Sequence, residues 1–395
     1  MQNSIISSEL VSRRQFNASL ASLLSANITH TEANASAAQA HNVKIGVNCF
    51  DLFYGLIVDP QRTRHPNARL RELRMKQIPL VRFSCSPFWA KEWGHYQNNR
   101  AKYFSAMDSV FEAAETQQIK LVPSLFWNPF SVSDLVREPV SAWAREGSAT
   151  RDFMRRYTED VITRYKGNAS ILMWEFGNEF NSYADLPNAL QWWPKVDVAM
   201  GTPASRSKLD LIKASDCASA FAYFASMAKQ IDPQRLVGSG ADIPNFNAQN
   251  LARGSFSVDT ESEFRAALTK LTPSGVDVMS IHLYPQREGK YFGKKTSSFA
   301  NILSEVTASA HAAGKKVFIG EFGVPRMANA EAERQTFGRL LDSIVASKVD
   351  WAALWVYDLW NQEKEWSVRF DNDRAWQLDQ IAAANQRVQG LNNGG

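Results

Sequence analysis

The chain has 395 residues, of which 45% are hydrophobic and 21% are charged. This composition is that of a globular protein with a sizeable core, and it excludes a disordered chain, a collagen and a small disulfide scaffold. The formal net charge is only +4, and the basic residues are scattered rather than clustered. The charge therefore gives no support to a nucleic-acid or anionic-membrane partner.

The first forty residues differ from the rest of the chain. The segment 12–16, Ser-Arg-Arg-Gln-Phe, is similar to a twin-arginine export motif, and a mildly apolar stretch and a small-residue tract follow it. We therefore expect residues 1–40 to be an export signal, cleaved after Ala40, that delivers the protein to the bacterial periplasm or the medium. A disordered tail with a chance arginine pair is the alternative.

Outside this signal, no stretch approaches the roughly 18 consecutive apolar residues that a membrane-spanning helix needs. The sequence therefore predicts no membrane contact after signal removal. The three cysteines are Cys49, Cys85 and Cys217, and no local motif would activate one of them as a nucleophile. We expect buried structural cysteines, with a Cys49–Cys85 bridge as the less favoured alternative.

From residue 43 onward, short runs rich in Val, Ile and Leu alternate with longer segments of helical spacing. This alternation is typical of parallel strands that are connected by crossover helices. Eight strands are predicted, over residues 43–48, 80–84, 121–127, 171–178, 235–239, 278–284, 317–321 and 352–357. The sequence thus predicts an α/β fold, a single (β/α)8 TIM barrel within residues 41–395.

The predicted barrel is longer than the typical length of about 250 residues, so we expect long insertions in the βα loops, the largest between Phe180 and Leu236. Gly167 and Gly314 follow two predicted helices, where a left-handed cap is common. An open doubly wound sheet is the main alternative fold. However, no Gly-x-Gly-x-x-Gly turn follows the first strand, and the chain has no phosphate loop.

Two glutamates stand where predicted strands end, which is where TIM barrels carry their chemistry. Glu179 follows the fourth strand, and Glu321 ends the seventh. A closed barrel lets these two strands face each other across its mouth. Cleavage of a glycosidic bond requires such a pair, with one carboxyl group protonated and the other ionised. Taken alone, each Glu could equally be a salt-bridged barrel residue.

Together with their neighbours, these glutamates resemble the site of glycoside hydrolase family 5 or of a close relative in the same retaining clan. The resemblance covers essentially the whole mature chain and rests on Arg82, Asn178, Glu179, His282, Tyr284, Glu321 and Trp355. It implies that Glu179 is the general acid/base and that Glu321 is the nucleophile. It also implies that Asn178 hydrogen-bonds the 2-hydroxyl of the sugar.

The resemblance implies a role for each remaining residue of this set. Arg82 would keep Glu321 ionised, and Tyr284 would hydrogen-bond the same carboxylate. His282 would help to hold the acid/base and the sugar. Trp355 would form the floor beneath the sugar that is bound next to the scissile bond.

The substrate is indicated less sharply. Trp127 and Asn128 end the third predicted strand, where many family members place a substrate-contacting His, and they look like the ends of this strand in β-mannanases. The segment 282–285, His-Leu-Tyr-Pro, is mannanase-like but occurs more widely. Phe176 and Phe180 depart from the family pattern without removing a chemical group. The resemblance implies a retaining hydrolase of endo-β-1,4-glucanase or endo-β-1,4-mannanase type. The residues themselves do not decide whether the substrate is glucan or mannan, or whether the enzyme cuts within the chain or at its end.

Other candidate residues have simpler interpretations. Glu175 points to the same side of its strand as Glu179 but lies deeper, so we expect it to be a structural partner of Arg82 or of another interior donor. Tryptophans of the predicted βα loops could stack on sugars or simply pack, and they are Trp89, Trp93, Trp192, Trp193 and Trp360.

No metal or cofactor is expected. The six histidines show no paired spacing for zinc, and the segment Asp371-Asn-Asp373 lacks the Gly and the distant Glu of a calcium loop. We expect a monomer that binds a β-linked polysaccharide or oligosaccharide. A transglycosylase with the same site and a non-catalytic carbohydrate-binding barrel are the alternative functions, and the presence of both glutamates argues against the second.

Overall fold

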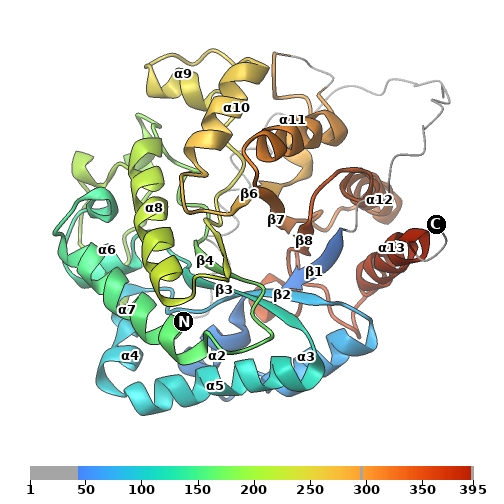
Figure 1. Cartoon of the computed structure of the whole chain (residues 1–395), viewed down its shortest axis with the longest axis horizontal. Helices are drawn as coiled ribbons and strands as arrows, with labels where there is room; N and C mark the ends of the chain where they lie inside the picture. Colours follow the sequence, from blue (N-terminus) through green and yellow to red (C-terminus); the bar gives the residue numbers. More distant parts are fainter. Residues whose placement is uncertain (1–42, 294–296, 393–395) are drawn as a thin grey trace.

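The computed structural model describes residues 43–293 and 297–392, so the predicted signal over residues 1–40 lies outside the described residues. Eight parallel strands form a closed barrel in which β8 pairs with β1 (Figure 1). The predicted (β/α)8 barrel is therefore confirmed. The strands are β1 (Lys44–Asn48), β2 (Leu80–Ser84), β3 (Lys120–Phe126), β4 (Met173–Gly177), β5 (Leu236–Gly238), β6 (Val278–Leu283), β7 (Lys316–Phe322) and β8 (Trp351–Leu354).

All eight predicted strands are present, with ends that differ by at most three residues, the largest difference being at the end of β8. The strands are buried along nearly their whole length. Burial on both faces explains why they appear in the sequence as continuous apolar runs rather than as alternating patterns.

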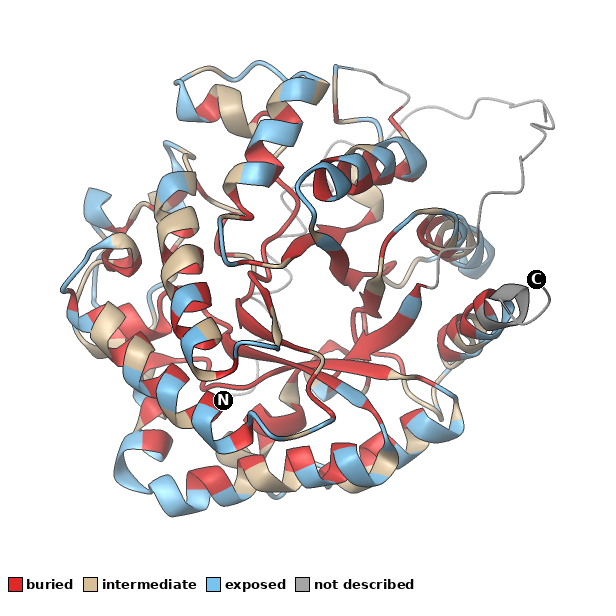
Figure 2. Ribbon diagram, in the orientation of Figure 1, coloured by how far each residue is buried: buried red, intermediate tan, exposed pale blue. Residues whose placement is uncertain are grey.

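Helices surround the barrel and bury one face each, as Figure 2 shows. The long ones are α2 (Asp51–Val58), α3 (Pro66–Met75), α5 (Arg100–Gln117), α7 (Ala149–Tyr165), α8 (Ala214–Ile231), α10 (Glu261–Lys270), α11 (Phe299–Ala312), α12 (Ala330–Ala346) and α13 (Trp376–Asn392). The short ones are α4 (Gly94–Asn98), α6 (Ser131–Leu135) and α9 (Ala248–Ala252). No helix in the described part of the chain is long and apolar enough to cross a membrane.

The predicted helix ends are partly confirmed. Gly314, past the end of α11, has φ +64, so this glycine adopts the expected left-handed conformation. Gly167 does not, so that expectation is wrong. The reason is local: Lys166 stays helical and donates to the Ile162 carbonyl, and the Asn168 amide then donates to the Tyr165 carbonyl. A turn, not a left-handed residue, ends α7.

The largest insertion lies where it was predicted, between β4 and α8. Residues 181–213, called the insertion below, contain only short 3-10 turns, η4 (Ala189–Gln191), η5 (Val198–Met200) and η6 (Lys208–Asp210). Arg206 of the insertion forms a bidentate ion pair with Asp134 of α6, at 2.6 and 2.9 Å. The insertion is thus held over the neighbouring β3 loop.

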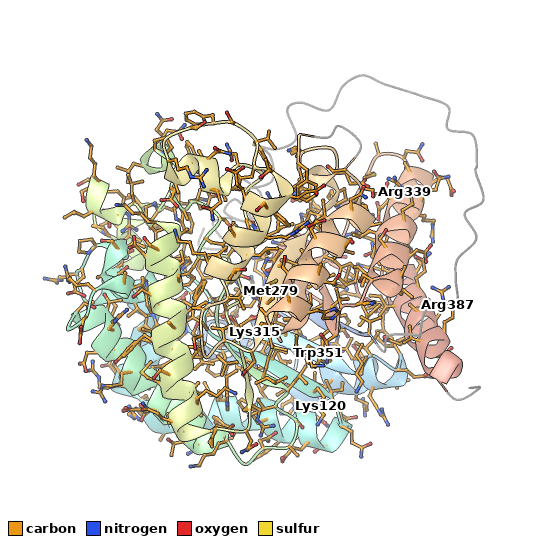
Figure 3. The ribbon with its side chains drawn as sticks, turned by 45° about the horizontal axis from the view of Figure 1, so that its top comes forward. Lys120, Met279, Lys315, Arg339, Trp351 and Arg387 are labelled. Carbon is orange, nitrogen blue, oxygen red and sulfur yellow. The ribbon has the colours of Figure 1, made fainter. Side chains whose placement is uncertain are left out.

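The three cysteines are buried and form no disulfide, as expected. Burial raises the pKa of the Cys49 and Cys85 thiols far above the ordinary value, which keeps them protonated and unreactive. The two ends of the barrel differ in character. Lys120 and Trp351 begin β3 and β8 at the N-terminal end (Figure 3), whereas the candidate site lies at the opposite, C-terminal end.

Candidate active site

Arg82 of β2 forms the base of the site. It is fully buried, and its Nε lies 2.7 and 2.6 Å from the two carboxylate oxygens of Glu175 on β4. Its two terminal nitrogens donate to Glu321 Oε1 at 3.3 Å and to Asn178 Oδ1 at 2.8 Å. The expected pairing of Arg82 with Glu175 is therefore present, and the same guanidinium reaches both Glu321 and Asn178.

Asn48 completes this base and is a residue that the sequence analysis missed. Its Oδ1 accepts a hydrogen bond of 3.1 Å from Arg82 Nη1, and its Nδ2 donates to the Gly320 carbonyl at 2.8 Å. Asn48 ends β1, so the criterion that singled out Glu179 and Glu321, a polar side chain at a strand end, would have found it too.

The two glutamates converge as predicted. Tyr284 donates to Glu321 Oε2 at 2.6 Å, and His282 Nδ1 lies 3.0 Å from Glu179 Oε1 and 3.6 Å from Glu321 Oε2. One donor atom from each of Glu179, His282 and Glu321 lies within 4.8 Å of the other two. Carboxyl groups about 5 to 5.5 Å apart are typical of retaining glycosidases, whereas inverting enzymes keep them about 6.5 to 9.5 Å apart.

The backbone aims Glu179 into the barrel mouth. Glu179 has φ +53, a left-handed conformation that is costly for a residue with a side chain, and its amide donates to the Gly240 carbonyl at 2.8 Å. Gly240 itself has φ +67, and a Cβ there would lie 1.8 Å from the Gly177 carbonyl oxygen. The turn that presents Glu179 therefore depends on a glycine at the end of the neighbouring strand.

His282 lies between the two glutamates. Its complete burial alone would lower its pKa, but the charge of Glu321 and the hydrogen bond and charge of Glu179 outweigh burial and raise the pKa above the ordinary value. Its Nε2 is buried and has no hydrogen-bond partner in the described part of the chain. A protonated His282 would donate through Nδ1 to Glu179 Oε1.

Aromatic rings line the wall beside the glutamates. Trp127 lies beneath Arg82, with the guanidinium carbon 4.4 Å from the ring centroid, and its ring centroid is 6.1 Å from that of Trp355. Trp355 Nε1 donates to Gln362 Oε1 at 2.9 Å, which orients this ring. Phe50 of the β1 loop packs on both tryptophans.

Asn128 has a different environment from the other predicted site residues. Its Nδ2 donates to the Phe88 carbonyl at 2.7 Å, and its Oδ1 accepts from the Phe130 amide. Both ends of the amide thus bind main chain and hold the β3 loop against the β2 loop. The structure shows no contact of Asn128 with either glutamate, and its contact with substrate stays a prediction.

The tryptophans of the loops divide into two groups. Trp89 and Trp93 are buried, so packing explains them. Trp193 is half-buried and stacks on Tyr183 at 4.7 Å, with 16° between the ring planes. Trp360, in contrast, is 46% exposed at the mouth of the barrel. Of the five candidate platforms, Trp360 presents the largest free surface.

The spacing of Glu179, His282 and Glu321 would also suit a metal ion. The sequence predicts no metal there, and the hydrogen bonds that His282 and Tyr284 make already account for the close approach of the carboxylates. The other segment considered for a cation, residues 371–373, forms ion pairs instead, because Asp373 pairs with Arg326.

Comparison with known proteins identifies a family whose members the chain matches over most of its length. Residues 61–363 match the family described as cellulase (glycosyl hydrolase family 5). No curated protein matches the chain in sequence.

Three similar solved structures share the fold. An endo-1,4-β-D-mannanase from Thermotoga petrophila RKU-1 has a TM-score of 0.63 and 15% identity, with 87% of this chain and 99% of that chain covered. An endo-1,4-β-mannanase from Rhizomucor miehei has a TM-score of 0.61 and 16% identity, with 90% and 97% covered. A glycoside hydrolase family 5 mannosidase from Rhizomucor miehei has a TM-score of 0.62 and 12% identity, with 89% and 94% covered.

Proposed function

Because the chain belongs to glycosyl hydrolase family 5 and is therefore a glycoside hydrolase, we propose that it cuts β-1,4-linked mannan or glucan with retention of configuration. The observation that carries this proposal is the close approach of Glu179 and Glu321 around His282, within 4.8 Å. Retaining enzymes hold their two carboxyl groups close together so that one can attack the sugar carbon directly, whereas inverting enzymes hold them further apart around a water molecule.

In the first step Glu321 attacks the anomeric carbon. A bond forms between its carboxylate oxygen and that carbon, the glycosidic carbon–oxygen bond breaks, and Glu179 gives its proton to the departing oxygen. In the second step Glu179 takes a proton from a water molecule, the water oxygen bonds to the anomeric carbon, and the bond to Glu321 breaks. Two inversions retain the configuration.

The neighbouring side chains suit these roles. Tyr284 and Arg82 both donate to Glu321, which orients its carboxylate for attack and supports the carboxylate again as it leaves. Asn178, whose Oδ1 accepts from Arg82, keeps its amide nitrogen for the sugar 2-hydroxyl. The family resemblance places Trp355 beneath the sugar ring; its side chain is only 1% exposed, so this contact stays a prediction.

Mannan is the first substrate to test. Two features support it: the similar solved structures include mannanases and a mannosidase, and Trp127 and Asn128, directly after β3, resemble the residues at this place in β-mannanases. Glucan is the second substrate, because the matching family is described as cellulase.

The proposed enzyme is a monomer that acts outside the cytoplasm. The support is the pair Arg13-Arg14 within residues 12–16. Replacing both arginines by lysine should retain the protein in the cytoplasm of a bacterial host, as measured by cell fractionation. Unchanged export of this variant would refute the twin-arginine assignment.

The decisive experiment measures hydrolysis of β-1,4-mannan, glucomannan, β-1,4-glucan and β-1,3-glucan by the wild type and by Glu321→Gln. We expect the variant to lose several orders of magnitude of activity with an unchanged fold, as seen by circular dichroism. Glu288→Gln is the matched control, since Glu288 lies in the β6 loop and pairs with Arg339 away from the glutamate pair.

A covalent probe tests the roles directly. A 2-deoxy-2-fluoro-β-mannoside with a good leaving group should add one sugar to the wild type, and peptide mass spectrometry should locate that sugar on Glu321. A fully active Glu321→Gln protein, or a sugar attached to another residue, would refute the assignment.

A further inference from the structure

A second cleft adjoins the aromatic wall of the site. It has a volume of about 590 Å³, within the range of small-molecule sites. Its lining includes Phe50, which packs on Trp355, and extends to Trp89, Trp360 and Asn361. The cleft thus lies between the β1, β2 and β8 loops at the same mouth of the barrel.

The roles of the two glutamates determine which end of a sugar chain would lie in this cleft. In the proposed reaction the sugar that bonds to Glu321 lies toward Trp355. The leaving group lies beside Glu179, whose backbone and side chain contact the β5 loop and His282 of β6. The β1, β2 and β8 loops lie on the other side, beyond Trp355. A chain bound in the cleft would therefore extend toward its non-reducing end.

Two features of the cleft point to a polar ligand with flat faces. The Asn361 side-chain oxygen is buried and has no hydrogen-bond partner in the described part of the chain, which is costly unless a ligand or solvent donates to it. Trp360 offers an exposed ring, with the Arg62 guanidinium carbon 5.7 Å from the ring centroid. A neutral hexose supplies hydroxyl donors and an apolar ring face, and so matches both.

Part of the cleft wall comes from a distant part of the chain. Met200 of the insertion contributes to the lining. Beside it, Lys91 of the β2 loop donates to the Ala199 carbonyl at 3.4 Å. Gly201 approaches so closely that a Cβ there would lie 3.0 Å from the Lys91 amide nitrogen. The insertion therefore crosses the β3 loop and meets the β2 loop at the wall of the cleft.

We propose that this cleft binds the non-reducing end of a β-1,4-linked hexose chain and that the tip of the insertion closes it. The number of sugar units on this side of the scissile bond is then limited, and the enzyme cuts at a constant short distance from the non-reducing end. This proposal rests on the proposed function and goes beyond it, because it assigns chain-end action and names the segment that enforces it.

Product analysis tests the proposal. Oligosaccharides of β-1,4-linked mannose and of β-1,4-linked glucose, labelled at the reducing end, are digested with the wild type. We expect one cut position, counted from the non-reducing end, for every chain length. Polymer digestion should release reducing sugar without an early fall in viscosity. Cuts spread through the interior and a rapid fall in viscosity would overturn the proposal while leaving the proposed function intact.

Variants locate the closed end. The double variant Lys91→Ala, Met200→Ala should broaden the distribution of cut positions, because it removes the two side chains at the contact. Val198→Ala is the matched control, since Val198 lies in the same short turn but is 62% exposed and outside the lining. An unchanged cut position in the double variant would overturn the role of the insertion tip.

A binding measurement stays informative even if no substrate is hydrolysed. In calorimetry with Glu321→Gln and the same oligosaccharides, the affinity should increase with the number of sugar units only until the cleft is filled. Trp360→Ala should weaken binding about tenfold, which corresponds to about 1.4 kcal/mol. If Glu321→Gln binds the oligosaccharides with the same affinity with and without Trp360→Ala, the proposed binding site is overturned. If the wild type hydrolyses no substrate but these oligosaccharides still bind, only the proposed function is refuted.

Discussion

At the scale of single residues, one guanidinium group is divided between two carboxylates. Arg82 approaches Glu175 to 2.6 Å but Glu321 only to 3.3 Å. Burial raises the pKa of Glu175, and the charge and hydrogen bonds of Arg82 oppose that effect. Arg82 thus lies closer to its structural partner than to the proposed nucleophile, to which Tyr284 donates at the shorter distance of 2.6 Å.

His282 should make the stability of the protein depend on pH. Its pKa is raised in the folded protein, so the stabilising interaction of the cationic ring with Glu321 and Glu179 is fully present below the unfolded value of about 6.5. This contribution is lost as the pH rises through the folded value. We expect the difference in free energy of unfolding between wild type and His282→Gln to shrink as the pH rises from the unfolded pKa of His282 through its folded pKa.

Urea denaturation of both proteins, from about pH 5 to about pH 9, measures this difference. His311→Gln serves as the control, because His311 is exposed on α11 and belongs to no part of the glutamate site. A difference for His282→Gln that does not change with pH would contradict the assigned charge.

At the scale of the elements, the end of each strand determines where its loop residue points. β4 ends at Gly177, and the left-handed Glu179 follows it. The amide of Glu179 is held by the carbonyl of Gly240 at the end of β5. The proposed acid/base is therefore positioned by pairing between two consecutive βα loops rather than by its own strand.

Gly240→Ala should disrupt this pairing. A Cβ would lie 1.8 Å from the Gly177 carbonyl, so the β5 loop must move, and a displacement of about 1 Å near a reacting group can cost about 10²-fold in rate. Gly254→Ala is the control: it has a similar positive φ of +79, but nothing lies within 4 Å of its added Cβ. Steady-state kinetics of both variants separate steric displacement from backbone strain, and equal activities would contradict the prediction.

The insertion should depend on one buried ion pair. The side chains of Arg206 and Asp134 are only 4% and 1% exposed, and breaking a buried pair costs about 3 to 5 kcal/mol. Arg206→Ala should therefore make residues 181–213 sensitive to limited proteolysis before the barrel unfolds. Arg145→Ala breaks the more exposed pair with Glu138 and should leave the cleavage pattern unchanged. Resistance of Arg206→Ala to proteolysis would show that other contacts anchor the insertion.

At the scale of the whole molecule, the barrel is closed with help from the last helix. Asn385 of α13 accepts from the Ile45 amide and donates to the Ile45 carbonyl of β1, both at 2.9 Å. β1 also pairs with β8, so the two ends of the described chain meet at the seam of the barrel. The position of Trp355, just past β8, is linked through this seam to the C-terminal helix.

Asn385→Ala should weaken the entire domain. It leaves two buried backbone groups of Ile45 without partners, at about 1 to 3 kcal/mol each. We expect tryptophan fluorescence and enzymatic activity to be lost together at a lower urea concentration than in the wild type. Gln386→Ala, one position further along and exposed, is the control. Loss of α13 without loss of activity would contradict the proposed role of the seam.

Much of the fold and of the site could be predicted from local patterns. Parallel strands buried on both faces appear as apolar runs, and polar residues directly after such runs lie at the barrel mouth. Glu179 and Glu321 were found in this way, whereas the family resemblance identified His282 and supplied the roles of all three residues. Asn48 was missed although it obeys the same rule, and the cap at Gly167 was predicted wrongly because adjacent hydrogen bonds, not residue type, ended α7.

The sequence by itself determined the closed barrel, the position of the insertion along the chain and the strand ends that carry the two glutamates, because periodicity and chain order are local properties. Only the tertiary structure decided that Arg82 is shared between Glu175 and Glu321, that Gly240 holds Glu179, and that Met200 meets the β2 loop. These contacts join segments far apart in the chain, and their geometry exists only once the barrel has closed and each loop has packed on its neighbours.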